Sequence, residues 1–129
     1  MDVVAVVDDD EAVRRAMQRV LRAAGYAVAP YASGAEFLDS LDRETPACVL
    51  LDGQLPDMHG SEVLARLAAR SPRVPAIVVT GHDTPEYRRA AAAYGAVAFF
   101  PKPFEAEALL VQIRSVVGGP GDHKQQPKN

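Results

Sequence analysis

Five polar residues capable of chemistry stand after four separate apolar stretches of this sequence. Asp8 and Asp9 follow the first stretch, Asp52 ends the second, Thr80 ends the third, and Lys102 comes shortly after the last. A charge at the end of a buried stretch is costly to remove from water unless a partner uses it. Three carboxylates brought together would repel one another, and a hard divalent cation with oxygen ligands would relieve that repulsion.

The chemistry that suits this set is transfer of a phosphoryl group. An Asp carboxylate is a nucleophile toward phosphoryl groups, and the transfer requires mainly positioning and neutralisation of charge. Mg²⁺ prefers one or two carboxylates, water and a phosphate oxygen. In such a site Lys102 would add a second cation, Thr80 a hydroxyl donor, and Gly81 room for the incoming group.

Each of these residues also has a simpler interpretation. Asp9 or Asp10 could only cap the helix that follows, and Asp52 could only stabilise a turn. Thr80 could be an ordinary strand terminus and Lys102 an ordinary exposed lysine. Their joint occurrence, each after a different apolar run, favours the phosphoryl interpretation. The sequence contains no glycine-rich phosphate loop, so nucleotide binding is not expected.

The elements that must position these residues are predicted from the spacing of apolar residues. Runs of strand length are bounded by Gly and Pro, and helical spacing follows each run. The strands are expected at Val3–Val7, Tyr26–Tyr31, the run ending on Asp52, Ala76–Val79 and Val97–Phe100. Five strand–helix repeats with doubly buried strands predict an α/β fold, a parallel sheet covered by helices. Two strand orders fit, and both put the loops after the strands at one edge, where ligands bind.

Local signals mark where the helices begin and end. Ser33-Gly34-Ala35-Glu36 has the spacing of a capping box, and Gly25 is suited to ending the first helix. Asp83 or Thr84 can cap the fourth helix, with Pro85 in its first turn.

Composition restricts the class of protein. The chain has 129 residues, 48% of them hydrophobic and 24% charged, which is typical of one globular domain. The net charge of −3 argues against direct nucleic-acid binding by this domain. Cys48 is the only cysteine, so the chain can form no internal disulfide, and we expect this residue in the core. Since the sequence also shows no signal peptide and no apolar run long enough to span a membrane, we expect a cytoplasmic location. We expect residues 1–117 to fold and residues 118–129, rich in Gly, Pro, Gln and Lys, to form a flexible tail or linker.

Four motifs resemble those of response-regulator receiver domains of bacterial two-component signalling, over residues 2 to 117. They are Val6-Val7-Asp8-Asp9-Asp10, the stretch Leu50-Leu51-Asp52-Gly53-Gln54-Leu55-Pro56-Asp57-Met58-His59-Gly60, Thr80-Gly81-His82 and Lys102-Pro103-Phe104. The wording of the second and third is most similar to the FixJ-type subgroup, often joined to a helix-turn-helix DNA-binding domain. The resemblance implies a flavodoxin-like (βα)5 three-layer sandwich with strand order 2-1-3-4-5.

The resemblance also implies roles for individual residues. Asp52 would accept a phosphoryl group from a histidine kinase or a histidine phosphotransfer protein. Asp9, Asp52 and the backbone carbonyl of Gln54 would bind Mg²⁺, with Asp8 acting through water. Thr80 and Lys102 would bind the phosphoryl oxygens.

Two further features are implied at the fifth strand. The Lys102–Pro103 peptide bond is expected to be cis. Phe99 occupies the family's aromatic switch position and would move with Thr80, although it is equally suited to being a core aromatic. The surface of the fourth helix, fifth strand and fifth helix would then act on an output partner. That surface and the first helix are the candidate contacts for a homodimer.

Three residues depart from or modify the family pattern. Gly53 follows Asp52 where the family more often has a larger residue. Gln54 and His82 lie two residues beyond Asp52 and Thr80, where they could alter the rate at which the phosphoryl group is lost.

Two rival functions are kept beside the phosphorylation-activated switch. One rival is a phospho-aspartyl hydrolase of the haloacid-dehalogenase type, whose site loosely resembles Asp8, Asp10, Thr80 and Lys102. That family requires a Thr soon after its Asp pair and usually has a cap insertion, and this sequence has neither. An interaction module that never receives phosphate is the other rival. The switch would not be an enzyme beyond slow autodephosphorylation.

Overall fold

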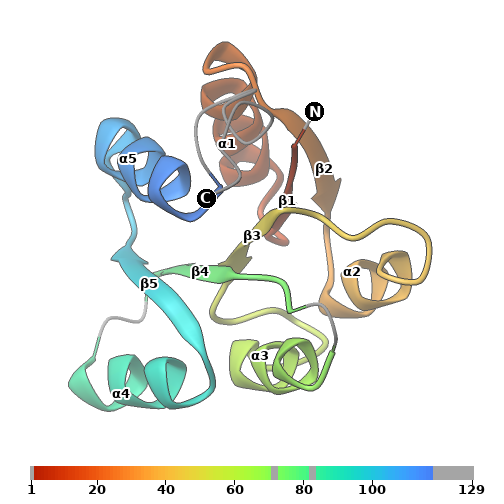
Figure 1. The fold of residues 1–129 in the computed structure, drawn as a ribbon. Helices are drawn as coiled ribbons and strands as arrows, with labels where there is room; N and C mark the ends of the chain where they lie inside the picture. Colours follow the sequence, from red (N-terminus) through yellow and green to blue (C-terminus); the bar gives the residue numbers. More distant parts are fainter. Residues whose placement is uncertain (1, 71–72, 82–83, 118–129) are drawn as a thin grey trace, which may run out of the picture.

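The computed structural model describes residues 2–70, 73–81 and 84–117 of the chain. His82, the alternative helix cap Asp83 and the predicted tail at 118–129 lie outside the described residues. The elements in chain order are β1 (Val3–Val7), α1 (Glu11–Ala23), β2 (Ala27–Tyr31), α2 (Gly34–Ser40), β3 (Cys48–Asp52), α3 (Gly60–Ala68), β4 (Ala76–Thr80), α4 (Pro85–Ala93), β5 (Ala96–Pro101) and α5 (Ala106–Val117). The predicted alternation of strands and helices is confirmed (Figure 1).

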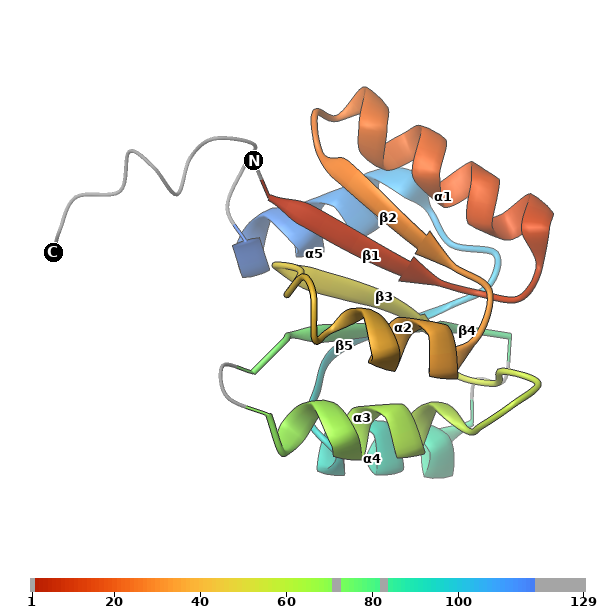
Figure 2. The ribbon, with the colours of Figure 1, turned by 90° about the vertical axis from the view of Figure 1, so that its right-hand side faces the viewer.

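All five strands are parallel and form one sheet in the order β2-β1-β3-β4-β5. The flavodoxin-like fold expected from the resemblance is therefore confirmed. Because the strands point the same way, the loops after them meet at one edge of the sheet (Figure 2). β3 is the central strand, and Asp52 is its last residue.

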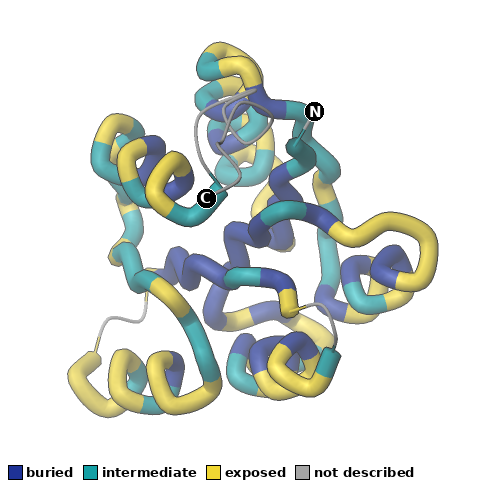
Figure 3. Tube along the Cα trace, viewed as in Figure 1, coloured by how far each residue is buried: buried dark blue, intermediate teal, exposed yellow. Residues whose placement is uncertain are grey.

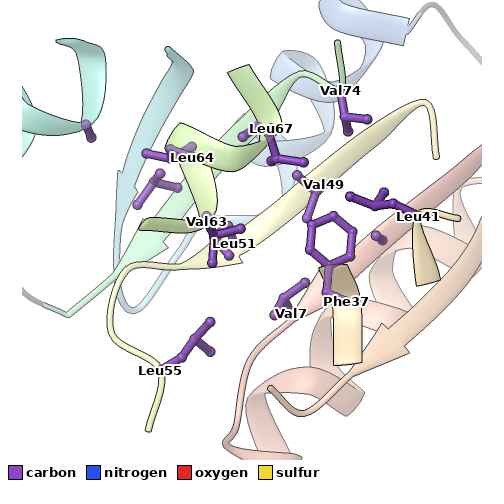
Figure 4. Close-up of a cluster of buried hydrophobic side chains, with 14 residues drawn as sticks. Val7, Phe37, Leu41, Val49, Leu51, Leu55, Val63, Leu64, Leu67 and Val74 are labelled. Atoms are coloured by element: carbon purple, nitrogen blue, oxygen red, sulfur yellow. The ribbon is translucent and has the colours of Figure 1, made fainter. Parts of the chain in front are cut away.

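Two hydrophobic cores lie between the sheet and the helices on its two faces, so the fold has three layers. Buried residues gather along the central strands, and exposed residues along the outer sides of the helices (Figure 3). Helices α2, α3 and α4 pack on one face, where Phe37 lies among Val49, Leu51 and Leu67 (Figure 4). Helices α1 and α5 pack on the other face. Cys48 lies in this second core, as expected, and burial raises the pKa of its thiol to about 12.

Side-chain caps begin the helices that flank the sheet edge. Asp10 caps α1, accepting hydrogen bonds from the backbone N–H groups of Ala12 at 2.9 Å and Val13 at 3.2 Å. This leaves Asp9 outside the cap. Thr84 caps α4 by accepting a bond from the Tyr87 N–H at 3.1 Å. Within the described ranges, no helix is long and apolar enough to span a membrane.

Candidate acidic site at the carboxyl edge of the sheet

Three carboxylates from two adjacent strands converge at the carboxyl edge. Asp8 and Asp9 follow β1, and Asp52 ends β3, which pairs with β1. Each offers a carboxylate oxygen, and these oxygens lie within 4.8 Å of one another. Asp8 is 1% exposed and Asp52 is 7% exposed, whereas Asp9 is exposed to solvent. Two charges are therefore buried at the base of the site and one stands at its mouth.

Lys102 directly follows β5, the edge strand that lies two strands away from β3, and its side chain reaches the acidic cluster. Its Nζ donates a hydrogen bond to Asp8 Oδ2 at 2.9 Å and lies 3.6 Å from Asp52 Oδ1. The backbone N–H of Lys102 donates to the Thr80 carbonyl at 2.8 Å, and the Lys102–Pro103 bond is cis. One ammonium group thus faces two of the three carboxylates.

Thr80 and Gly81 form the side of the site contributed by β4. Asp52 pairs with Val79 across the β3–β4 ladder, so Thr80 lies one residue beyond the acidic side chain. Thr80 is 1% exposed. A Cβ built on Gly81 would meet no atom within 4 Å, so there is open space beside Thr80.

The charges at the site alter one another's protonation. Burial, followed by the charge of Asp8, raises the pKa of Asp52 to about 6, although the Gln54 N–H and Lys102 oppose the shift. Burial acts to lower the pKa of Lys102, but its hydrogen bond to Asp8 and the nearby charge of Asp52 raise it overall. The lysine therefore stays charged while the central carboxylate carries a desolvation penalty.

The loop after Asp52 contacts helix α4 through a residue that sequence reasoning did not single out. The Gln54 N–H donates to Asp52 Oδ1 at 3.2 Å, and the Tyr87 hydroxyl donates to the Gly53 carbonyl at 3.0 Å. Burial and the charge of Asp52 raise the pKa of Tyr87. Gly53 and Tyr87 are 34 residues apart, and no motif relates them.

Phe99 lies outside the acidic cluster, on the face of the sheet covered by α4. Its ring meets that of Tyr87 edge-on, with centroids 5.6 Å apart, and the Arg88 guanidinium lies 4.6 Å from its centroid. Phe99 is half-buried. It packs against the core and also borders solvent, and its role as a switch stays a prediction.

Asp57 is a second residue whose contacts no sequence pattern indicated. Its carboxylate accepts hydrogen bonds from the backbone N–H groups of Gly34 at 3.1 Å and Ala35 at 2.9 Å. These bonds, that from Ala35 first, lower the pKa of Asp57. They attach the loop after β3 to the beginning of α2.

The arrangement offers a carboxylate nucleophile, a cation and a set of hard oxygen donors in one place. The donor set fits Mg²⁺, which prefers carboxylate and carbonyl oxygens and keeps several waters. Both oxygens of Asp8 already have protein donors, Lys102 Nζ and the Asp10 N–H. Asp9 and Asp52 are the carboxylates better placed to contact a cation directly.

A family model, curated relatives and solved structures all match this chain. Residues 4–114 match the family model described as the response regulator receiver domain. The chain is 36% identical over 126 residues to the transcriptional regulatory protein FixJ of Azorhizobium caulinodans, covering 95% of this chain and 58% of that protein. It is 32% identical over 127 residues to the DNA-binding transcriptional regulator NtrC of Escherichia coli, covering 98% of this chain and 27% of that protein.

A solved structure agrees with these relatives. The response regulator receiver protein from Burkholderia phymatum superposes with a TM-score of 0.81 at 43% identity, covering 92% of this chain and 96% of that one. The relatives FixJ and NtrC are longer than the chain, which spans 58% of FixJ and 27% of NtrC. The family model covers β2 to β5 in full and β1 from its second residue. The chain belongs to the response regulator receiver domain family, whose members are phosphoacceptors rather than classical enzymes.

Proposed function

We propose that this domain is a signalling switch in which Asp52 accepts a phosphoryl group from a histidine kinase or a histidine phosphotransfer protein. A carboxylate oxygen of Asp52 attacks phosphorus, and an acyl phosphate bond forms. The bond from phosphorus to the donor's histidine nitrogen breaks, and its electron pair stays on that nitrogen, which takes up a proton. The phosphoryl group thereby moves from imidazole to carboxylate without any change in oxidation state.

One observation carries this proposal: the convergence of Asp8, Asp9 and Asp52 within 4.8 Å, with Lys102 Nζ 3.6 Å from Asp52. A fold would not gain stability by burying like charges together without a ligand. Asp52 ends the central strand with Lys102 Nζ 3.6 Å away, whereas Asp8 already accepts a hydrogen bond from that lysine at 2.9 Å. Lys102 and Thr80 would bind the phosphoryl oxygens, and the open space at Gly81 would admit the group.

Mg²⁺ is the proposed cofactor. Asp9, Asp52 and the Gln54 backbone carbonyl would hold it, with Asp8 acting through a water molecule because its oxygens already accept bonds from Lys102 and the Asp10 N–H. When bound, the cation would neutralise charge on the transferring group. Asp52 would then be held ionised and close to the phosphoryl group of the donor.

The change of state would be transmitted through Thr80 and Phe99. A phosphoryl group adds about 1.5 to 2 negative charges and new acceptor oxygens, which would draw the Thr80 hydroxyl toward Asp52. The space vacated beside β5 would let Phe99 turn inward. Moving the population from 1:99 to 99:1 requires a difference of about 5.5 kcal/mol, which several charge-assisted bonds in a dry site can supply.

The output surface we propose is that of α4, β5 and α5, which carries the exposed apolar residues Tyr94, Val97 and Val111. This surface, or α1, is also the proposed contact of a homodimer. We place the domain in the FixJ-type subgroup on the wording of its Thr80-Gly81-His82 and Pro56-Asp57-Met58 motifs. An output in transcription is supported by the names of the relatives FixJ and NtrC.

The proposal is tested by intact mass after incubation with Mg²⁺ and a small-molecule phosphodonor. Wild-type protein should gain one phosphoryl group, and omission of Mg²⁺ should prevent the gain. Asp52→Asn should gain none. Asp57→Asn is the matched control: it removes an exposed carboxylate five residues away on the same loop and should be phosphorylated like wild type.

Other outcomes separate the rival functions. Steady release of phosphate over many turnovers, without an accumulating adduct, would indicate a phospho-aspartyl hydrolase. Unchanged mass in wild-type protein would indicate an interaction module. A mass gain retained in Asp52→Asn would overturn the assignment of the acceptor.

A further inference from the structure

Two glycines and one tyrosine form a close junction beside the acidic site. The Gly53 carbonyl accepts two hydrogen bonds, one from the Gly60 N–H and one from the Tyr87 hydroxyl, both at 3.0 Å. The first bond closes the loop between β3 and α3 on itself. The second attaches that loop to α4.

The glycine at position 53 makes room for the tyrosine. A Cβ built there would overlap the Tyr87 hydroxyl and would lie 2.8 and 2.9 Å from two carbons of its ring. A Cβ on Gly60 would lie 3.1 Å from the same hydroxyl. Gly53 does not have a positive φ, so its backbone conformation is open to other residues. Space for Tyr87, rather than backbone strain, therefore explains the glycine.

The ring of Tyr87 also meets the ring of Phe99. The two rings are nearly perpendicular, with an interplanar angle of 70° and centroids 5.6 Å apart, a favourable edge-to-face arrangement. One side chain on α4 therefore touches both the loop next to Asp52 and the aromatic ring on β5. Among the contacts of the described residues, this is a direct route between the two.

We propose that Tyr87 is a positioning residue: it holds the loop after Asp52 through Gly53 and moves Phe99 when that loop shifts. The inference rests on the proposed phosphorylation of Asp52. A phosphoryl group on Asp52 would displace the adjacent peptide of Gly53, and the bonded hydroxyl would carry that displacement into the ring that packs on Phe99. Because the hydroxyl and the ring belong to one rigid side chain, α4 and Phe99 would respond together.

The first test needs no phosphodonor. Gly53→Ala should lower the melting temperature by about 4 °C or more in an otherwise wild-type protein, because Tyr87 must be displaced. In a Tyr87→Ala background the same substitution should lower it by less than about 1 °C. The control background is Tyr94→Ala, which removes a second tyrosine, at the C-cap of α4. In this background Gly53→Ala should lower the melting temperature as much as it does in the wild type. Equal effects in all three backgrounds would overturn the packing argument.

The second test measures transmission. 4-Fluorophenylalanine is introduced only at position 99, by suppression of an amber codon, so that each protein gives a single ¹⁹F signal, that of residue 99, and the three other phenylalanines are unlabelled. Tyr87→Phe keeps the ring but loses the hydroxyl bond. It should gain one phosphoryl group, as wild type does, while the shift of the Phe99 signal on phosphorylation falls to half or less. Tyr94→Phe should keep the full shift.

An unaltered Phe99 shift in phosphorylated Tyr87→Phe would overturn the inference while leaving the proposed function intact. Failure of wild-type protein itself to gain a phosphoryl group would overturn the proposed function instead. In that case the melting-temperature experiment would still decide whether Tyr87 holds the Gly53 loop.

Discussion

Asp52 carries a charge at a position where folding alone favours an apolar group. It ends the central strand, is 7% exposed, and lies beside the almost fully buried Asp8. Burial and that neighbour raise its pKa to about 6, even with Lys102 and the Gln54 N–H opposing the shift. At neutral pH the protein therefore holds an ionised group that would be better solvated in the unfolded chain. This cost is the physical reason why a cation or a phosphoryl group is expected there.

The cost of Asp52 should be measurable as a pH-dependent stability. Because its pKa is raised on folding, the native state binds more protons than the unfolded state between about pH 4 and pH 6, and stability falls as pH rises through that range. Asp52→Asn removes this penalty. In the absence of divalent cations, we expect the variant to match wild type near pH 4 and to exceed it by on the order of 2 kcal/mol at pH 7.5, as measured by urea unfolding.

A control for this prediction is Asp42→Asn, which changes an exposed carboxylate beyond the carboxyl end of α2. Its stability relative to wild type should not follow the same trend. A stability difference for Asp52→Asn that is the same at pH 4 and pH 7.5 would contradict the argument that ionisation of Asp52 is responsible.

Helix α2 depends on a residue far away in sequence. The Ser33 hydroxyl accepts a bond from the Glu36 N–H at 3.1 Å, so this half of the predicted capping box is confirmed. The Glu36 side chain instead accepts from the Ala32 N–H at 3.2 Å. The first two N–H groups of the helix, those of Gly34 and Ala35, donate to Asp57. Local spacing could predict the Ser33 cap, but the Asp57 contact requires the loop after β3 to lie against α2.

Asp57→Ala should weaken this connection between elements. Loss of an N-terminal cap typically costs about 1 kcal/mol, and we expect that order of loss in urea unfolding at pH 7. The pKa of Asp57 is lowered on folding, so its contribution is present above its unfolded-state pKa and is lost as pH falls through its folded-state pKa. The difference between variant and wild type should therefore shrink below about pH 4.

Asp57→Asn distinguishes charge from hydrogen bonding at the same position. The amide keeps one acceptor oxygen, so this variant should retain part of the stability lost in Asp57→Ala, and its deficit should vary less with pH. Asp57→Ala with wild-type stability at pH 7 would mean that the two bonds at α2 make no net contribution.

At the scale of the molecule, periodicity predicted the elements but not their neighbours. The apolar runs of β1, β3 and β4 are alike, and all three strands are buried, so nothing in them distinguishes their order. The edge strands carry a weak signal, because β2 contains Pro30 and β5 ends on Pro101, and proline is confined to edges and strand ends. The strand order 2-1-3-4-5 was predicted only because the motifs resemble those of a family that has this order. The contacts of Tyr87 and Asp57 depend on that tertiary arrangement, which is why spacing alone could not predict them.

The proposed Mg²⁺ site should couple the stability of the whole molecule to the cation. The carboxylates of Asp8, Asp9 and Asp52 come together only when β1 and β3 pair, so a cation that they bind stabilises the folded state and not the unfolded chain. At about ten times its dissociation constant, Mg²⁺ should add about 1.4 kcal/mol, a rise in melting temperature of about 4 °C.

Adjacent carboxylates provide the decisive comparison for this coupling. Asp9→Ala should lose most of the Mg²⁺-dependent rise in melting temperature, because it removes a proposed ligand from the mouth of the site. Asp10→Ala should begin from a lower melting temperature, since Asp10 caps α1, yet keep the full rise. The two variants thus separate loss of a ligand from loss of stability one residue apart. An undiminished rise in Asp9→Ala would mean that Mg²⁺ stabilises the fold through other oxygens, and the role assigned to Asp9 would be wrong.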